Sequence, residues 1–203
     1  MTKLTDKKRK EWQKWGNEEH IANERMMRRN IRHSNYNTEE KRAKVHEAGE
    51  RGESYLFSDE RRARLIEKFG YTEESINEAR EAWIHGYKLG QKQCAKYRAI
   101  IEKYKPIFNE AEKIAQEVDV SDIVDGFPCG SAHLYLQNYA EVEDLYKALG
   151  FFNGDSSEPY KRRLPIKTPN HGQCIAYDER ICRVVNEFLR SNGIFSSVHS
   201  WID

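Results

Sequence analysis

The chain has 203 residues and a formal net charge of +1, with 38% hydrophobic and 33% charged residues. Its length allows one large domain or one small domain with a helical extension, and the low apolar content favours the second arrangement. No run of about 18 apolar residues is present, which excludes a membrane-spanning helix, and no apolar core of a secretory signal follows the basic start.

The positive charge is concentrated in the first third of the chain. Residues 1–69 contain 18 Lys and Arg against 13 Asp and Glu, whereas residues 70–125 and 126–203 are slightly acidic. A polyanion or an acidic protein surface is the natural partner of such a basic region. None of the four cysteines belongs to a CxxC motif, so we expect reduced thiols and a cytoplasmic protein.

Residues 1–118 have the composition of helices almost without a break. The first helical stretch, 5–33, contains good helix formers and no proline. Three hydroxyl residues stand immediately before acidic residues that open further helical stretches, as N-caps do. These N-caps are Thr38, Ser58 and Thr72.

The longest predicted helix covers residues 72–105. Its apolar residues recur with a period of 3.5, as in a helix that packs along a seam. They are Ile76, Trp83, Tyr87, Gly90, Cys94, Tyr97, Ile101 and Tyr104. Gly86 and Gly90 lie one turn apart and allow a second backbone to come close. The helix is either the centre of a single-chain bundle or a homodimer interface, and Pro106 is expected to end it.

After Gly126 the periodicity changes from helical to alternating. The expected elements are strand 131–137, helix 140–150, strand 160–167, strand 173–178, helix 178–192 and strand 194–202. This βαββαβ order is typical of a ferredoxin-like fold, in which two helices cover one face of a small antiparallel sheet. The predicted fold class is α+β, with a helical region at 1–118 that contains one long helix, and a small α+β domain at 126–203.

Four short motifs occur in the last third of the chain. They are CGSA from Cys129, GQC from Gly172, NGI from Asn192 and SWID from Ser200. By these motifs the region resembles a family of small tailed-bacteriophage proteins, from which it departs at His133 and Trp201. The resemblance implies a phage origin and an action in the cytoplasm of the host cell, and it implies no catalytic residue.

His133 and His199 fall on the first and last predicted strands, which are neighbours in a ferredoxin-like order. Two-histidine phosphoesterases place a hydroxyl residue two positions after each histidine, whereas Trp201 occupies the second of these positions and has no hydroxyl. We therefore expect both histidines to be structural. The alternative is a small hydrolase or metal-dependent phosphoesterase centred on His133, His171 and His199, with Cys174 as a further ligand.

The first helix carries basic residues and a pair of tryptophans, and a further basic cluster follows the loop that ends at residue 159. The residues expected to bind a partner are Lys7, Lys8, Arg9, Lys10, Trp12, Trp15, Arg25, Arg28, Arg29, Arg32, Lys161, Arg162 and Arg163, and Lys14 adds to the first group. The four arginines of the helix share one face and offer bidentate donors to phosphates. The tryptophans either stack on bases or pack on the bundle.

No Walker loop, nucleophile elbow or GxGxxG motif occurs, and neither a cofactor nor a metal is expected. The leading interpretation is a phage-derived, non-enzymatic binding protein. It would engage nucleic acid or a host nucleoprotein complex and inhibit a host defence system such as CRISPR or restriction. An acidic host protein surface is the alternative partner, and a solvated charged helix with no partner is the simplest explanation of the basic residues.

Overall fold

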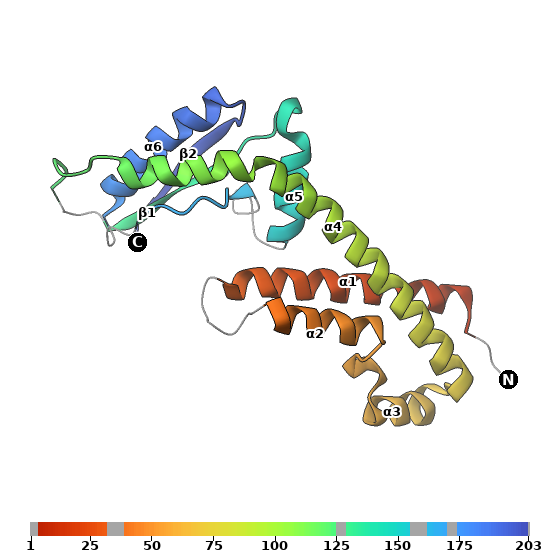
Figure 1. The fold of residues 1–203 in the computed structure, drawn as a ribbon. Helices are drawn as coiled ribbons and strands as arrows, with labels where there is room; N and C mark the ends of the chain where they lie inside the picture. Colours follow the sequence, from red (N-terminus) through yellow and green to blue (C-terminus); the bar gives the residue numbers. More distant parts are fainter. Residues whose placement is uncertain (1–3, 32–38, 125–128, 155–161, 170–173, 203) are drawn as a thin grey trace. The chain divides into compact units, whose positions relative to one another are not determined.

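The computed structural model describes residues 4–31, 39–124, 129–154, 162–169 and 174–202, with the backbone alone for 27–31 and 39–42. The chain divides into two compact units, Met1–Lys96 and Tyr97–Asp203, and the longest helix belongs to both (Figure 1). No helix in the described ranges is long and apolar enough to cross a membrane.

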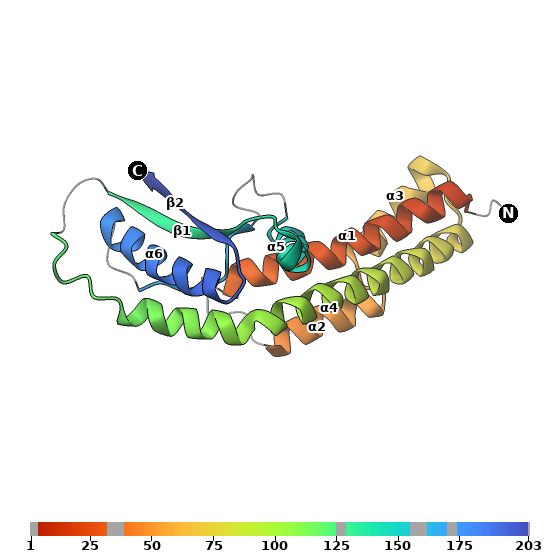
Figure 2. The same cartoon turned by 90° about the horizontal axis from the view of Figure 1, so that it is seen from above.

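All described secondary structure of the first unit is helical. Its elements are α1 (Asp6–Ile31), α2 (Glu39–Glu50), the short 3-10 helix η1 (Tyr55–Phe57), α3 (Asp59–Phe69) and the first part of α4 (Glu73–Glu117). Figure 1 shows the first part of α4 crossing α1, and Figure 2 shows the same two helices from above. The predicted helical character of this region is therefore confirmed.

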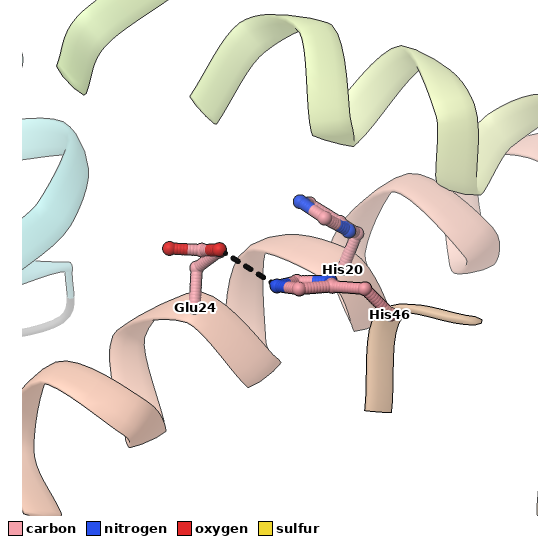
Figure 3. A group of neighbouring side chains, drawn as sticks. All are labelled: His20, Glu24 and His46. Carbon is pink, nitrogen blue, oxygen red and sulfur yellow. Dashed lines mark ion pairs between the residues drawn. The ribbon is translucent and has the colours of Figure 1, made fainter. Parts of the chain in front are cut away.

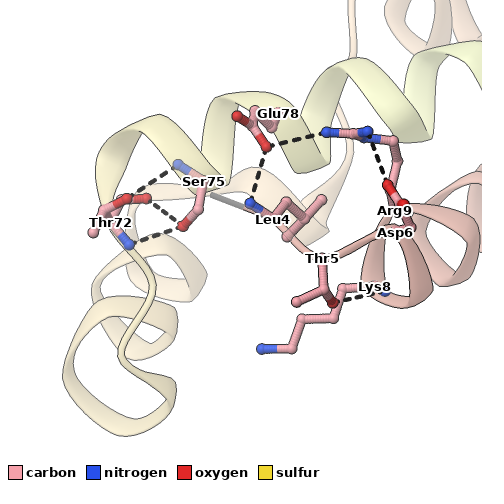
Figure 4. Close-up of polar contacts among 8 residues, drawn as sticks. All are labelled: Leu4, Thr5, Asp6, Lys8, Arg9, Thr72, Ser75 and Glu78. Carbon is pink, nitrogen blue, oxygen red and sulfur yellow. Dashed lines mark hydrogen bonds and ion pairs between the residues drawn. The ribbon is translucent and has the colours of Figure 1, made fainter. Parts of the chain in front are cut away.

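Two of the three predicted N-caps are confirmed. The hydroxyl of Ser58 accepts a hydrogen bond from the N–H of Arg61 at 3.4 Å. Oγ1 of Thr72 accepts one from the N–H of Ser75 at 3.2 Å, and Oγ of Ser75 accepts one from the N–H of Thr72 at 2.9 Å (Figure 4). These bonds satisfy donors that the first turn of a helix leaves open. Thr38 lies outside the described residues.

Helix α4 passes through Pro106, so the prediction that the proline ends it was wrong. Proline removes one backbone donor and crowds the carbonyl four residues before it. The helix continues because Phe108, Ala111 and Ala115 extend one buried stripe beyond the proline, each 4% exposed or less. This stripe packs in the core of the second unit, although the sequence placed it in the helical region 1–118.

The apolar seam of α4 packs within the chain. A Cβ added at Gly86 would lie 1.8 Å from the carbonyl oxygen of Gln13, and one added at Gly16 would lie 2.0 Å from that of Trp83. The backbones of α1 and α4 therefore touch, which glycine at the crossing makes possible. Trp83 and Tyr87 of the seam are completely buried. Packing inside one chain thus accounts for Trp83, Gly86 and Tyr87, and the homodimer through residues 72–105 stays a prediction.

The second unit is α+β, as predicted, and its sheet has two described strands. β1 (Gly130–Leu136) pairs antiparallel with β2 (Ser196–Ile202), close to the predicted first and last strands. The short η2 (Ala140–Val142) and α5 (Glu143–Asn153) follow β1, and α6 (Ile175–Ser191) precedes β2. Helix α6 packs on both strands, and α6, α5 and the last part of α4 enclose the core with them.

The ferredoxin-like arrangement is not confirmed, because two predicted strands are absent from the described residues. In the described part of the second predicted strand, 162–167, a single bridge joins Arg163 to Tyr135, and Pro165 has no N–H for a longer ladder. The prediction of a strand at 173–178 was wrong, since α6 begins at Ile175. Ile175, Cys182 and Leu189 lie seven residues apart and are buried. The buried stripe of α6 therefore begins at Ile175, and the helix begins with it.

Candidate functional site

The lysines at the start of α1 are exposed, as a binding surface requires. Lys7, Lys10 and Lys14 are all exposed. Nζ of Lys14 lies 3.7 Å from Oε1 of Glu18. Lys8 is also exposed, but its ammonium lies 4.6 Å from the centre of the Tyr71 ring. Lys8 is thus partly engaged by the chain itself.

Arg9 connects the start of α1 to the start of α4. Its Nη2 lies 3.4 Å from Oε2 of Glu78, and the same oxygen accepts a hydrogen bond from the N–H of Leu4 at 3.0 Å (Figure 4). Nη1 of Arg9 lies 3.4 Å from Oδ1 of Asp6. Exposed pairs of this kind contribute at most about 1 kcal/mol each. The charge of Arg9 is nevertheless balanced within the chain, which makes it a poorer candidate for binding than the lysines.

The two tryptophans of α1 have different surroundings. Trp12 is 4% exposed, and the centre of its ring lies 5.2 Å from that of Phe57, so it packs on the bundle. Trp15 is 44% exposed and meets Trp12 edge to face at 4.8 Å. A base can stack on an exposed indole but not on a buried one. Trp12 therefore belongs to the core, and the binding role of Trp15 stays a prediction.

The other predicted basic residues divide into described and undescribed side chains. The undescribed ones are Arg28, Arg29, Arg32 and Lys161. Arg25 is partly exposed. Arg162 places its guanidinium 4.0 Å from the centre of the Tyr146 ring, and Arg163 forms the bridge to Tyr135. Both are half-buried, so in the second basic cluster the described arginines contact their own unit.

His133 and His199 stand directly opposite each other on the paired strands. Nε2 of His199 lies 3.0 Å from Oγ of Ser197, and its ring lies 5.1 Å from that of Tyr135. The ring of His133 lies 5.6 Å from that of Trp201. Because alternate residues of β1 belong to the aliphatic core, these side chains share the other face of the sheet.

The alternative catalytic set is assembled only in part. His171 lies outside the described residues, and Cys174 is buried and forms an isolated backbone bridge with Cys129. Within the described ranges, neither His133 nor His199 belongs to a group of three side chains able to hold a metal. The expectation that these two histidines are structural therefore stays a prediction.

Three side chains of types that can ligate a metal, two of them buried, meet in the first unit at positions to which the sequence analysis assigned no role. His20 and Glu24 lie four residues apart on α1, and His46 extends toward them from α2 (Figure 3). Their ligand atoms all lie within 4.8 Å of one another. Nε2 of His46 is 2.9 Å from Oε1 of Glu24, and the two imidazole rings are 4.8 Å apart.

Tyr87 contacts this group from α4. Its ring stands at 89° to that of His20, with 4.7 Å between the ring centres, and its Oη lies 3.4 Å from Nδ1 of His46. A Cβ added at Gly49 of α2 would lie 2.1 Å from Cζ of Tyr87, so the glycine makes room for the ring. Burial raises the pKa of Tyr87 to about 12, against the opposing effect of a hydrogen bond with Asn23. The phenol is therefore neutral at pH 7.

One part of this group was visible in the sequence. His20 and Glu24 are four residues apart in a predicted helix, which places them on the same face. His46 belongs to another helix, and its approach depends on how α1 and α2 pack. A search for His and Glu four apart in helices would have found the first pair but not its third member.

Comparison of the chain with protein-family models, with curated proteins and with solved structures finds no significant match. Function is therefore inferred from two places in the first unit. One is the exposed lysine face of α1, defined by Lys7, Lys10 and Lys14. The other is the buried group of His20, Glu24 and His46.

Proposed function

We propose that this chain is a non-enzymatic binding protein whose helix α1 binds nucleic acid through its lysine face. The burial pattern of α1 carries the proposal. Lys7, Lys10 and Lys14 are exposed, whereas Trp12 and Gly16 on the opposite side of the helix are buried. The fold uses one side of α1 and leaves the three lysines, which stand beside the exposed Glu11 and Glu18, accessible to an anionic partner.

The spacing of the lysines suits a phosphate backbone. They lie at positions i, i+3 and i+7, which form one stripe along a helix. The stripe is about 10 Å long at 1.5 Å per residue, and this matches about three phosphates along a strand that rises 3.4 Å per nucleotide. Trp15 follows Lys14 and is 44% exposed, so its ring offers a stacking surface beside the charges.

The charged stripe has a natural continuation along the same helix. α1 is one helix as far as Ile31. Arg25 and Arg28 follow Lys7 and Lys10 by 18 residues in each case, which is about five helical turns. By position they return to the same side of α1, and a longer nucleic acid would reach them.

The proposed role of this binding is to occupy a host nucleoprotein surface. Contacts to phosphates position a protein on nucleic acid without reading its sequence. A charged helix of this kind therefore suits a protein that blocks access to a strand or a groove. The bacteriophage resemblance extends the proposal to inhibition of a defence complex, such as a CRISPR or restriction system, in the host cytoplasm.

The test compares two charge-reversed variants that change the net charge of the chain equally. The first replaces Lys7, Lys10 and Lys14 by Glu, and the control replaces three lysines of α4 that lie in the second unit. The control lysines are Lys103, Lys105 and Lys113. Fluorescence anisotropy measures the binding of single-stranded and duplex DNA of about 20 nucleotides between about 50 and 200 mM salt.

The wild-type chain and the control should bind and lose affinity steeply as salt rises, because neutralised phosphates release counterions. The α1 variant should bind at least about tenfold more weakly and reduce the log–log salt slope by about 2–3. Equal losses in both variants would assign the effect to net charge. Wild-type binding that ignores salt, or no DNA binding at low salt, contradicts the proposal and favours an acidic protein partner.

A second variant tests the indole. Trp15→Ala should weaken binding to single-stranded DNA by about 1–3 kcal/mol and leave duplex binding nearly unchanged, because bases are free to stack only in a single strand. Equal weakening for both oligonucleotides would indicate that Trp15 supports the helix rather than the bound strand.

A further inference from the structure

Two imidazole rings and one carboxylate meet in the interior of the first unit (Figure 3). We infer that His20, Glu24 and His46 bind one divalent transition-metal ion, with Zn²⁺ the ion of choice, and that the ion fastens α1 to α2. The inference is independent of nucleic-acid binding, because it concerns the buried side of α1 rather than its lysine face.

The three side chains agree in type and position with zinc ligands. Zn²⁺ binds imidazole nitrogen and carboxylate oxygen at about 2.0–2.2 Å in tetrahedral geometry, which separates ligand atoms by roughly 3.4 Å. Here the ligand atoms lie within 4.8 Å of one another, and Nε2 of His46 is 2.9 Å from Oε1 of Glu24. Side-chain rotations that move atoms by about 1 Å bring all three to bonding distance of a common point.

The charge of the group also favours a cation. Glu24 is 1% exposed and His20 is 2% exposed. A carboxylate removed from water is costly unless a positive charge or several hydrogen bonds compensate it. A protonated His46 supplies one positive charge and thereby loses a ligand nitrogen. A divalent ion supplies two charges and uses both imidazoles in their neutral form.

Tyr87 provides the support that a metal-bound histidine needs. With Nε2 of His46 on the ion, the proton of the ring resides on Nδ1, which lies 3.4 Å from Oη of Tyr87. A metal-ligating histidine generally donates its second N–H to such a partner, which fixes the tautomer and the ring orientation. The same tyrosine contacts the His20 ring edge to face, with 4.7 Å between the ring centres.

The burial of the ligands indicates a structural ion. His20 and Glu24 are almost fully covered, and the His46 side chain is 18% exposed. Three protein ligands leave one tetrahedral position, which a water molecule can fill. An ion in this place is shielded from a large substrate and joins α1 to α2, the next helix in the chain, so it acts on the stability of the unit.

The experiment uses the full chain, freed of metal by a chelator and without a histidine tag. Titration with Co²⁺, followed by its visible d–d absorption, should show one ion per chain, and Zn²⁺ should displace it. Zn²⁺ should raise the melting temperature by several degrees. A sulfur-to-cobalt charge-transfer band, which would place the ion on cysteines, should be absent.

Variants then assign the ion to its ligands. Co²⁺ binding should be at least about tenfold weaker in each of the variants His20→Gln, Glu24→Gln and His46→Gln. Tyr87→Phe should weaken it about tenfold, because Nδ1 of His46 loses its hydrogen-bond partner. The matched controls are His85→Gln and Glu18→Gln, which change exposed residues of the same unit and should bind Co²⁺ like the wild type. Circular dichroism verifies that each variant is folded.

Two readouts on the wild-type chain need no variant. NMR of the imidazole nitrogens should show two histidines shifting when Zn²⁺ is added, and the ratio of ion to chain should be one. A wild-type chain that binds neither ion overturns the inference. A thiolate-to-cobalt band or NMR shifts at other histidines would overturn it as well. Metal binding that survives in folded variants of the three ligands would have the same consequence.

Discussion

The two units of this protein pack their helices in different ways. In the first, α1 and α4 meet backbone to backbone at Gly16 and Gly86, beside the large rings of Trp83 and Tyr87. In the second, the core consists mainly of aliphatic side chains. Its completely buried members include Leu145, Ile181, Val185, Leu189 and Ile194.

The units also differ in what they bury besides hydrocarbon. Among the residues described in the structure, the buried polar or charged side chains of the first unit are His20, Glu24 and Ser75, and that of the second is Ser196. The first unit therefore depends on the fit of a few close contacts and on charge. The second depends on buried volume. We expect the stability of the first unit to respond to enlarged side chains and to pH, and that of the second to truncated side chains.

The largest effect is expected from an added methyl group in the first unit. Gly86→Ala should destabilise the protein by more than about 3 kcal/mol, because the new Cβ meets the backbone of Gln13, which cannot rotate away. Urea unfolding followed by circular dichroism measures the change.

The matched control adds a methyl group to the second unit. At Gly150 the new Cβ would lie 2.0 Å from Nη1 of Arg162, the end of a flexible side chain. Gly150→Ala should therefore change stability by less than about 1 kcal/mol. Similar losses at Gly86 and Gly150 would show that close backbone contact is not what distinguishes the first unit.

Truncation of a buried side chain should reduce stability most in the aliphatic core of the second unit. Leu189→Ala is expected to cost about 2–5 kcal/mol, since Leu189 is completely buried and its loss leaves a cavity. Val184→Ala on the same helix removes methyl groups from a side chain that is 38% exposed and should cost less than about 1 kcal/mol. Equal denaturation midpoints for the two variants would contradict a stability based on buried volume.

A smaller effect is expected on the other face of the sheet. The double variant His133→Ala, His199→Ala removes one cross-strand pair and should lower stability by about 1–2 kcal/mol. DNA binding should be unchanged, because the pair is predicted to be structural. A folded double variant without binding or biological activity would instead give these histidines a functional role.

The smallest effect is a dependence of the first unit on alkaline pH. The pKa of Tyr87 is raised by burial to about 12, from about 10 in the unfolded chain. Folding thus favours the neutral phenol, and its contribution is complete below pH 10 and is lost as the pH rises toward 12. The loss should reach about 1 kcal/mol near pH 11. Tyr87→Phe should lack this part of the alkaline destabilisation, as urea midpoints at pH 8 and pH 11 would show.

Local features of the fold were predictable from the sequence. Ser58 and Thr72 cap helices as expected, and Gly193 has φ 74° just past the end of α6, as a helix-ending glycine does. Capping depends on atoms within a few residues of the chain, so the necessary information is local. The wrong predictions concern places where a local signal competes with burial. Helix α4 continues through Pro106 and α6 begins at Ile175 because a stripe of buried side chains outweighs the local signal.

The sequence by itself determined the helical nature of the first unit, the period of its long helix and the alternation of the two strands. It also identified the basic residues of the first helix, among which the structure selected the lysine face. Only the tertiary structure decided that α1 packs on the first part of the α4 seam and that Trp12 is buried while Trp15 is exposed. It alone brings His46 to His20 and Glu24, because contacts between helices depend on packing between residues distant in the chain, which periodicity does not encode.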